Sequence, residues 1–79
     1  MQLGQNKTIL IIDDVSAIRA LFTRFLKLDG YDAVEAESGE DALELASKAH
    51  FDGILLDLNM PGVGGIETCR RLRALKEHA

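Results

Sequence analysis

The sequence predicts a small α/β domain built on a parallel β-sheet. Three short apolar runs alternate with three longer stretches in which apolar residues recur at helical spacing. Strands that alternate with amphipathic helices form parallel sheets with right-handed crossover connections. Seventy-nine residues are enough for one small domain, so we expect residues 1–79 to form a single domain, with residues 1–6 flexible.

The first half of the chain predicts two strands and one helix. Residues 8–12 are a β-branched apolar run, which is typical of a buried strand, and the run stops at Asp13 and Asp14. A helix should follow and end near Gly30, because glycine is favoured just beyond a helix C-terminus. Residues 32–36 alternate weakly, as an edge strand does. The apolar face of the helix comprises Val15, Ile18, Leu21, Phe22, Phe25 and Leu26.

The second half predicts two further helices around a third strand. Ser38 followed by Asp41 fits a helix-capping pattern, and this helix should run to about Ala49. The third strand is expected at residues 52–57, with residues 54–56 buried on both faces. The last helix begins near Gly65. The inward-facing positions expected are Ala42, Leu43, Ala46 and Ala49 in one helix, and Ile66, Cys69, Leu72 and Leu75 in the other.

Composition excludes several classes of protein. A net charge of −4 argues against nucleic acid as a direct partner, because phosphate backbones are bound by clustered Lys and Arg. The single cysteine, Cys69, cannot form an internal disulfide, which fits a reducing compartment. There is no apolar run long enough to span a membrane and no signal-peptide core. We therefore expect a soluble, cytoplasmic protein with no membrane partner.

Carboxylates follow two of the three predicted strands. Asp13 and Asp14 end the first strand and Asp57 ends the third. Parallel strands place their carboxyl ends at one edge of the sheet, where α/β folds bind ligands, so these acids should converge if the strands are neighbours. Converging like charges need a proton or a cation, and Mg²⁺ prefers oxygen ligands. The alternative is that each acid only caps a helix or faces water. Asp57, alone on its strand, is the better nucleophile towards phosphorus.

Three motifs in this chain closely resemble the receiver domain of two-component response regulators. They are Ile11-Ile-Asp-Asp14, Asp57-Leu-Asn-Met-Pro-Gly62 and Gly65-Ile-Glu67, and Gly30-Tyr31 and residues 37–43 also look like that family. The resemblance covers essentially the whole chain and implies a flavodoxin-like parallel sheet. It also implies a signalling module rather than an enzyme.

The resemblance assigns roles to the acids. It implies that Asp57 is the phosphoacceptor and that the phosphoryl donor is a phosphohistidine on a sensor histidine kinase. It further implies that Asp14 binds Mg²⁺ directly, that Asp13 supports the ion partly through water, and that Asn59 offers its backbone carbonyl. The metal ligands expected are thus Asp13, Asp14, Asp57 and Asn59.

The family's fold has five βα units in strand order 2-1-3-4-5, and these 79 residues correspond to the first three. The fourth and fifth strands of the family carry a Thr or Ser and a Lys that bind the phosphoryl group, and neither has a counterpart here. In a truncated (βα)₃ sheet of order 2-1-3 the third strand is an exposed edge. We expect a homodimer completed by antiparallel pairing of third strands, or by segment exchange. The alternative function is a self-associating half-domain that has lost phosphotransfer.

Other chemistry-bearing residues have simpler interpretations. His50 and His78 lack partners at metal-ligand spacing, so zinc is not expected. Cys69 is expected in the core, and no glycine-rich nucleotide-binding pattern is present. The basic residues of the last helix, Arg70, Arg71, Arg73 and Lys76, are expected to form a solvated face, although an acidic partner or nucleic acid is the alternative.

Overall fold

The computed structural model describes residues 7–57 and 65–77. Within them, strands and helices alternate as the sequence predicts. The elements are β1 (Thr8–Ile12), α1 (Ser16–Leu28), β2 (Asp32–Ala36), α2 (Gly39–Lys48), β3 (Gly53–Leu56) and α3 (Gly65–Glu77). None of the helices in the described part is long and apolar enough to cross a membrane.

The three strands form one parallel sheet in the order β2-β1-β3. This confirms the predicted α/β, flavodoxin-like arrangement. Leu10 and Ile12 of the central strand are fully buried on one face, and Ile11 is buried on the other. Leu10, Ile11 and Ile12 are thus enclosed, as expected for a central strand, whereas Thr8 and Ile9 at the start of β1 are half-buried.

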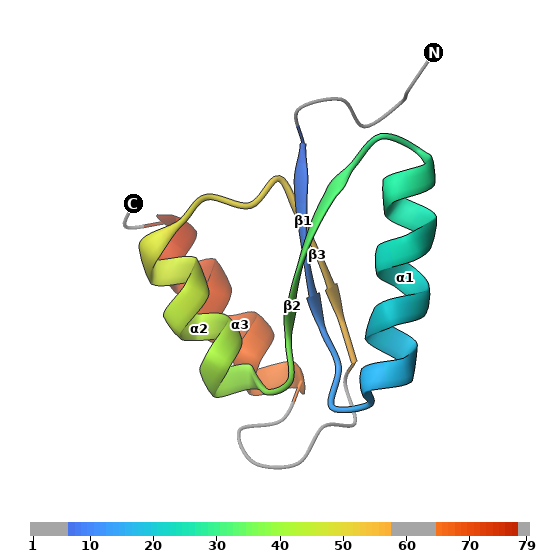
Figure 1. Ribbon diagram of the computed structural model, residues 1–79. Coiled ribbons are helices and arrows are strands. Elements are labelled where there is room, and N and C mark those ends of the chain that lie inside the picture. Colours follow the sequence, from blue (N-terminus) through green and yellow to red (C-terminus); the bar gives the residue numbers. More distant parts are fainter. Residues whose placement is uncertain (1–6, 58–64, 78–79) are drawn as a thin grey trace.

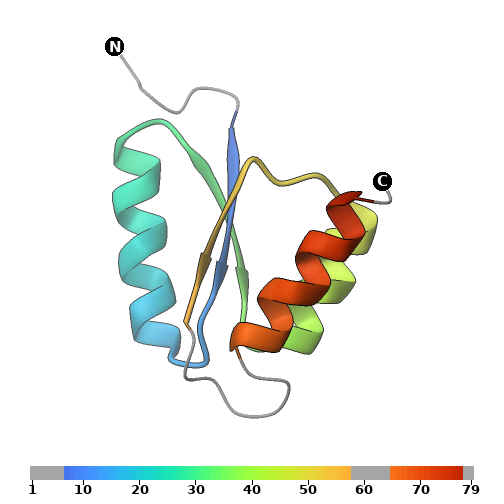
Figure 2. The same cartoon turned by 180° about the vertical axis from the view of Figure 1, so that it is seen from behind.

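The helices cover the two faces of the sheet unequally. Both views show α1 alone on one side and α2 with α3 on the other (Figures 1 and 2). The main core lies on the side of α2 and α3, where Leu10 and Ile12 meet Ala36, Ala42 and Leu72. Helix α1 has an amphipathic sequence, yet none of its residues is buried. The two faces therefore differ in how fully they are packed.

Local signals set the ends of the first two helices. Gly30 has a φ of 89°, and its N–H donates to the carbonyl of Lys27, while the Tyr31 N–H donates to that of Leu26. This is a Schellman termination, which favours glycine because of the positive φ. At the start of α2 the Ser38 hydroxyl accepts from the Asp41 N–H at 3.1 Å, which confirms the predicted cap.

Aspartate 52 ties the start of β3 to the start of β1. Its Oδ2 accepts a hydrogen bond from the Thr8 N–H at 2.8 Å, and its own N–H donates to the Thr8 carbonyl at 2.8 Å. The Thr8 hydrogen bond holds the pKa of the Asp52 carboxyl below its ordinary value. These contacts fix the register of the two strands at the end opposite the acid cluster.

Several burial predictions were wrong. Ile54 and Leu55 were expected to be buried on both faces of β3, but they are 42% and 40% exposed. In the described residues no strand pairs with the far side of β3. Leu56, the third residue of the run expected to be buried, is half-buried and packs against the main core. Ala49 is the exposed C-cap of α2 instead of an inward position, and Leu75, near the end of α3, is 38% exposed.

Candidate functional site

Three carboxylates meet where β1 and β3 end. One oxygen each from Asp13, Asp14 and Asp57 can be chosen so that all lie within 4.8 Å of one another. Asp13 is buried, Asp57 is half-buried and Asp14 is exposed. The predicted convergence of these acids is therefore present in the fold. It lies at the edge of the sheet to which the strand arrows point (Figure 1).

Strand pairing positions Asp57. Its N–H donates to the carbonyl of Ile12 at 2.9 Å, which extends the β1–β3 ladder by one bond. Ile12 is the last residue of β1 and immediately precedes Asp13 and Asp14. The pairing of the two strands therefore places Asp57 beside Asp13 and Asp14.

Asp13 is held through three of its groups. Its N–H donates to the Ala36 carbonyl at 3.2 Å, which continues the pairing of β1 with β2. Its Oδ1 accepts from the Val15 N–H at 2.9 Å, and its backbone carbonyl accepts from Arg19 Nη1 at 2.6 Å. An Asp carboxylate that accepts a hydrogen bond from the backbone N–H two residues later commonly fixes a tight turn. Asp13 thus commits one carboxylate oxygen to the turn, whereas Asp14 is the more exposed of the two acids.

This donor set suits a hard divalent cation. Carboxylate oxygens are the ligands that Mg²⁺ and Ca²⁺ prefer, and Mg²⁺ is commonly held by one or two carboxylates together with water. A cation also relieves the repulsion among three close negative charges. Asn59, the fourth ligand expected from the sequence, lies outside the described residues. The same is true of Met60, Pro61 and His78, and of the side chains of Ile66 and Lys76.

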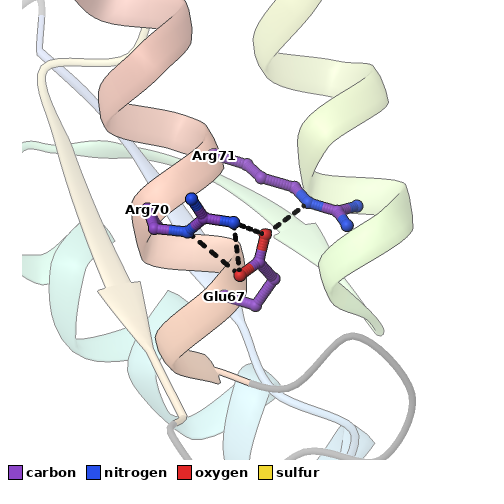
Figure 3. A network of polar contacts seen from close by, with 3 residues as sticks. All are labelled: Glu67, Arg70 and Arg71. Carbon is purple, nitrogen blue, oxygen red and sulfur yellow. Dashed lines mark hydrogen bonds and ion pairs between the residues drawn. The ribbon is translucent and has the colours of Figure 1, made fainter.

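The first turns of α3 carry a compact ionic network (Figure 3). The Glu67 carboxylate lies between two guanidinium groups: Arg70 Nη2 donates to its Oε2 at 2.7 Å, and Arg71 Nε donates to the same oxygen at 2.8 Å. The hydrogen bonds from Arg70 and then Arg71 hold the pKa of Glu67 below its ordinary value. Two of the four residues predicted as a solvated basic face are therefore paired with an acid of their own helix.

An apolar groove of about 620 Å³ lies beside β3, between the end of α2 and α3. Its walls include Ile54, Leu56, Cys69 and Leu72. Cys69 is half-buried and lines this groove, so its predicted place in the core is only partly confirmed. The groove is separate from the acid cluster and borders the exposed edge of the sheet.

Sequence reasoning missed Arg19 and assigned it no role. A signal was available: Arg19 lies in the first turns of the helix, where the helix dipole disfavours a cation, and no acid accompanies it in the first turn. A cation at such a position needs a local partner. Arg19 has two, the Asp13 carbonyl and the Glu35 carboxylate.

Comparison with known proteins identifies the family. Residues 9–79 match the family model described as the response regulator receiver domain. The chain belongs to this family. Transcriptional regulatory protein ResD of Bacillus subtilis is 46% identical over 72 residues, which are 90% of this chain and 30% of ResD. Sporulation initiation phosphotransferase F of the same organism is 37% identical over 73 residues, which are 92% of this chain and 59% of that protein.

Solved structures agree with the assignment. The response regulator TrrA of Thermotoga maritima, determined in complex with Mg²⁺ and BeF, superposes with a TM-score of 0.86 at 38% identity. The match covers 90% of this receiver chain and 62% of TrrA. The chain thus spans less than two thirds of the length of each of these three proteins. Receiver domains are regulatory modules of two-component signalling.

Proposed function

We propose that this receiver chain accepts a phosphoryl group on Asp57 from a phosphohistidine of a sensor histidine kinase, with Mg²⁺ as cofactor. The observation that carries the proposal is the convergence of Asp13, Asp14 and Asp57 at the ends of two paired strands. A relative of similar sequence is named as a phosphotransferase, and a structural neighbour was solved with Mg²⁺ and BeF. Both names are consistent with phosphoryl chemistry at this site.

In this proposal Asp57 is the nucleophile. An Asp57 carboxylate oxygen attacks phosphorus, a P–O bond forms, the P–N bond of the phosphohistidine breaks, and its electron pair stays on the imidazole nitrogen. Such a transfer asks the protein mainly for positioning and charge neutralisation. The backbone hydrogen bond from the Asp57 N–H to the Ile12 carbonyl supplies the positioning, because it fixes Asp57 relative to the other two acids.

The other acids have a supporting role. Asp14 and Asp57, with the backbone carbonyl of Asn59, would bind Mg²⁺ directly. Asp13, whose Oδ1 already accepts from the Val15 amide, would act partly through water. When bound, the ion neutralises charge that builds up on the phosphoryl oxygens.

Intact mass spectrometry tests this function. The chain is incubated with Mg²⁺ and acetyl phosphate, a small acyl-phosphate donor, and a single phosphoryl adduct is expected. The adduct should be absent in Asp57→Asn and in the presence of a chelator. Asp52→Asn is the matched control, because Asp52 lies at the opposite end of β3. No adduct on a folded wild-type chain, or an equal adduct on Asp57→Asn, would overturn the assignment.

The second candidate is a self-associating half-domain in which phosphotransfer is lost. The observation that favours it is the half-exposed apolar pair Ile54 and Leu55 on the edge strand β3, beside the apolar groove. Unpaired edge strands are templates for pairing with another chain. A second copy would pair antiparallel about a two-fold axis to give a six-stranded sheet of order 2-1-3-3′-1′-2′. Phosphotransfer and dimerisation are compatible, so only a failed phosphorylation test would favour this candidate over the first.

The remaining expectations follow the family. We propose that residues 1–79 act as one receiver unit, as a regulatory module and not as an enzyme. We further propose that it works in the cytoplasm, with neither nucleic acid nor membrane as a direct partner.

A further inference from the structure

Arg19 lies beside the acid cluster and reaches from helix to sheet. Its side chain is only 14% exposed. Nη1 donates to the backbone carbonyl of Asp13 at 2.6 Å, and Nε donates to Glu35 Oε1 at 3.1 Å. One guanidinium group therefore links α1, the end of β1 and strand β2.

The partner of Arg19 is itself fixed. Thr23, one turn further along α1, donates its hydroxyl to Glu35 Oε2 at 3.2 Å, so both Glu35 oxygens accept hydrogen bonds. A guanidinium group with a bound carboxylate loses much of its rotational freedom and presents its remaining N–H groups in a fixed direction. Glu35 thus aims Arg19 Nη1 at the Asp13 carbonyl.

The Asp13 carbonyl belongs to the peptide group that joins Asp13 to Asp14, the two acids that follow β1. Because a peptide group is planar, holding this carbonyl also fixes the direction of the Asp14 N–H and the position of the Asp14 Cα. The Asp13 side chain is held separately by the Val15 amide. Arg19 therefore holds the backbone at Asp14, from which the most exposed of the three acid side chains extends.

We propose that Arg19, aimed by Glu35, is a positioning residue that sets the affinity of the acid cluster for Mg²⁺. The inference rests on the proposed function, which assigns a divalent cation to this cluster. Mutation of an outer-shell residue that orients a metal ligand commonly weakens metal binding by about tenfold or more. Arg19 acts on the backbone of the ligand pair and does not itself bind the ion.

The test is a Mg²⁺ titration followed by backbone amide NMR shifts, with no phosphoryl donor present. The variant is Arg19→Lys, which keeps the positive charge but loses the two-pronged geometry of the guanidinium. We expect its dissociation constant for Mg²⁺ to rise about tenfold. Arg24→Lys, an exposed substitution on the same helix, is the matched control and should bind as the wild type does.

Glu35→Gln separates positioning from general stability. It should raise the dissociation constant for Mg²⁺ by a smaller factor than Arg19→Lys does. The double variant Arg19→Lys/Glu35→Gln should bind Mg²⁺ no more weakly than Arg19→Lys alone. Urea unfolding of each metal-free variant identifies any loss of fold. If Arg19→Lys does not fold, the Mg²⁺ affinity of Glu35→Gln tests the proposal instead. Unchanged affinity in the folded variants would overturn the positioning role. A wild-type chain that binds no Mg²⁺ would instead overturn the proposed function, and this inference with it.

Discussion

At Asp14, charge repulsion and metal binding oppose each other. Three carboxylates within 4.8 Å repel, and Asp14 is the one whose side chain is exposed. Without a cation, Asp14→Asn should raise the free energy of unfolding by about 1 kcal/mol, the energy of two unit charges roughly 4 Å apart in water. Urea denaturation in a chelating buffer measures this change.

Mg²⁺ should make the wild type more stable than Asp14→Asn. An ion that binds only the folded state stabilises it by mass action, by about 2.7 kcal/mol at a hundred times its dissociation constant. The wild type should gain this stability, and Asp14→Asn should gain much less. Asp32→Asn is the control, because it removes the same charge at the start of β2, at the other end of the sheet. If Asp14→Asn is less stable than the wild type without metal, while Asp32→Asn is not, the repulsion argument is contradicted.

Glu67 gives the chain a specific sensitivity to acid. Its pKa in the folded state lies below the ordinary value because Arg70 and Arg71 donate hydrogen bonds to it. Its stabilising contribution is therefore complete above the pKa of the unfolded chain, about 4.3, and is lost as pH falls through the lower folded-state pKa. Wild type should lose more stability than Glu67→Gln between pH 7 and pH 3.

Urea unfolding across this pH range measures the difference between the two proteins. Glu37→Gln removes an exposed carboxylate outside the network and is the control for charge alone. An NMR titration of the Glu67 carboxyl gives the folded-state pKa directly. A midpoint at or above the ordinary value would show that the network of Figure 3 does not persist in solution.

At the scale of elements, α2 and α3 meet through an unusually close contact. Thr68 of α3 is fully buried, and a Cβ added at Gly39 of α2 would collide with its hydroxyl oxygen. Gly39→Ala should therefore cost about 1–3 kcal/mol of stability, as overpacking does, despite the better helix propensity of alanine. Thermal or urea unfolding measures this loss.

A double variant isolates the collision. Thr68→Ala removes the hydroxyl, so Gly39→Ala should be much less harmful in a Thr68→Ala background than in the wild type. Ser47→Ala, an exposed change in the same helix, should alter stability by less than about 0.5 kcal/mol. Equal costs of Gly39→Ala in both backgrounds would show that α3 is not seated against Gly39.

The elements themselves were predictable because their signals are local. The apolar run 8–12, the Ser38 cap and Gly30 each act within a few residues, and the structure confirms all three. The convergence of the acids was also predictable, since parallel strands share a carboxyl edge. The position of Arg19 early in α1 indicates that it needs a partner, but the partners themselves were not predictable, because the packing of α1 against the sheet brings Asp13 and Glu35 to it.

Burial was harder to predict than secondary structure. An apolar run of the same kind is enclosed in β1 and half-exposed in β3, because β1 has a strand on each side and β3 has one in the described residues. The same holds for α1, whose Phe22 and Phe25 are 42% and 55% exposed despite a well-formed apolar face. Periodicity identifies the face that is able to be buried, whereas neighbouring elements decide whether it is buried.

For the molecule as a whole, these exposed surfaces predict association. We expect the chain to be a homodimer at tens of micromolar by light scattering, with a melting temperature that rises with protein concentration, as for any fold stabilised by its partner. Ile54→Lys places a charge on the edge strand, where charges prevent strand pairing. This variant should be monomeric, and its melting temperature should not depend on concentration.

Ala20→Lys is the matched control, since it adds the same charge at an exposed site on the polar face of α1, outside the groove, and should leave the dimer intact. The two variants separate edge pairing from a general effect of charge. A wild-type chain that is folded and cleanly monomeric at these concentrations would contradict the pairing of β3 strands. A dimer that survives Ile54→Lys would place the contact elsewhere, and the exposed face of α1, with Phe22 and Phe25, would be the next surface to test.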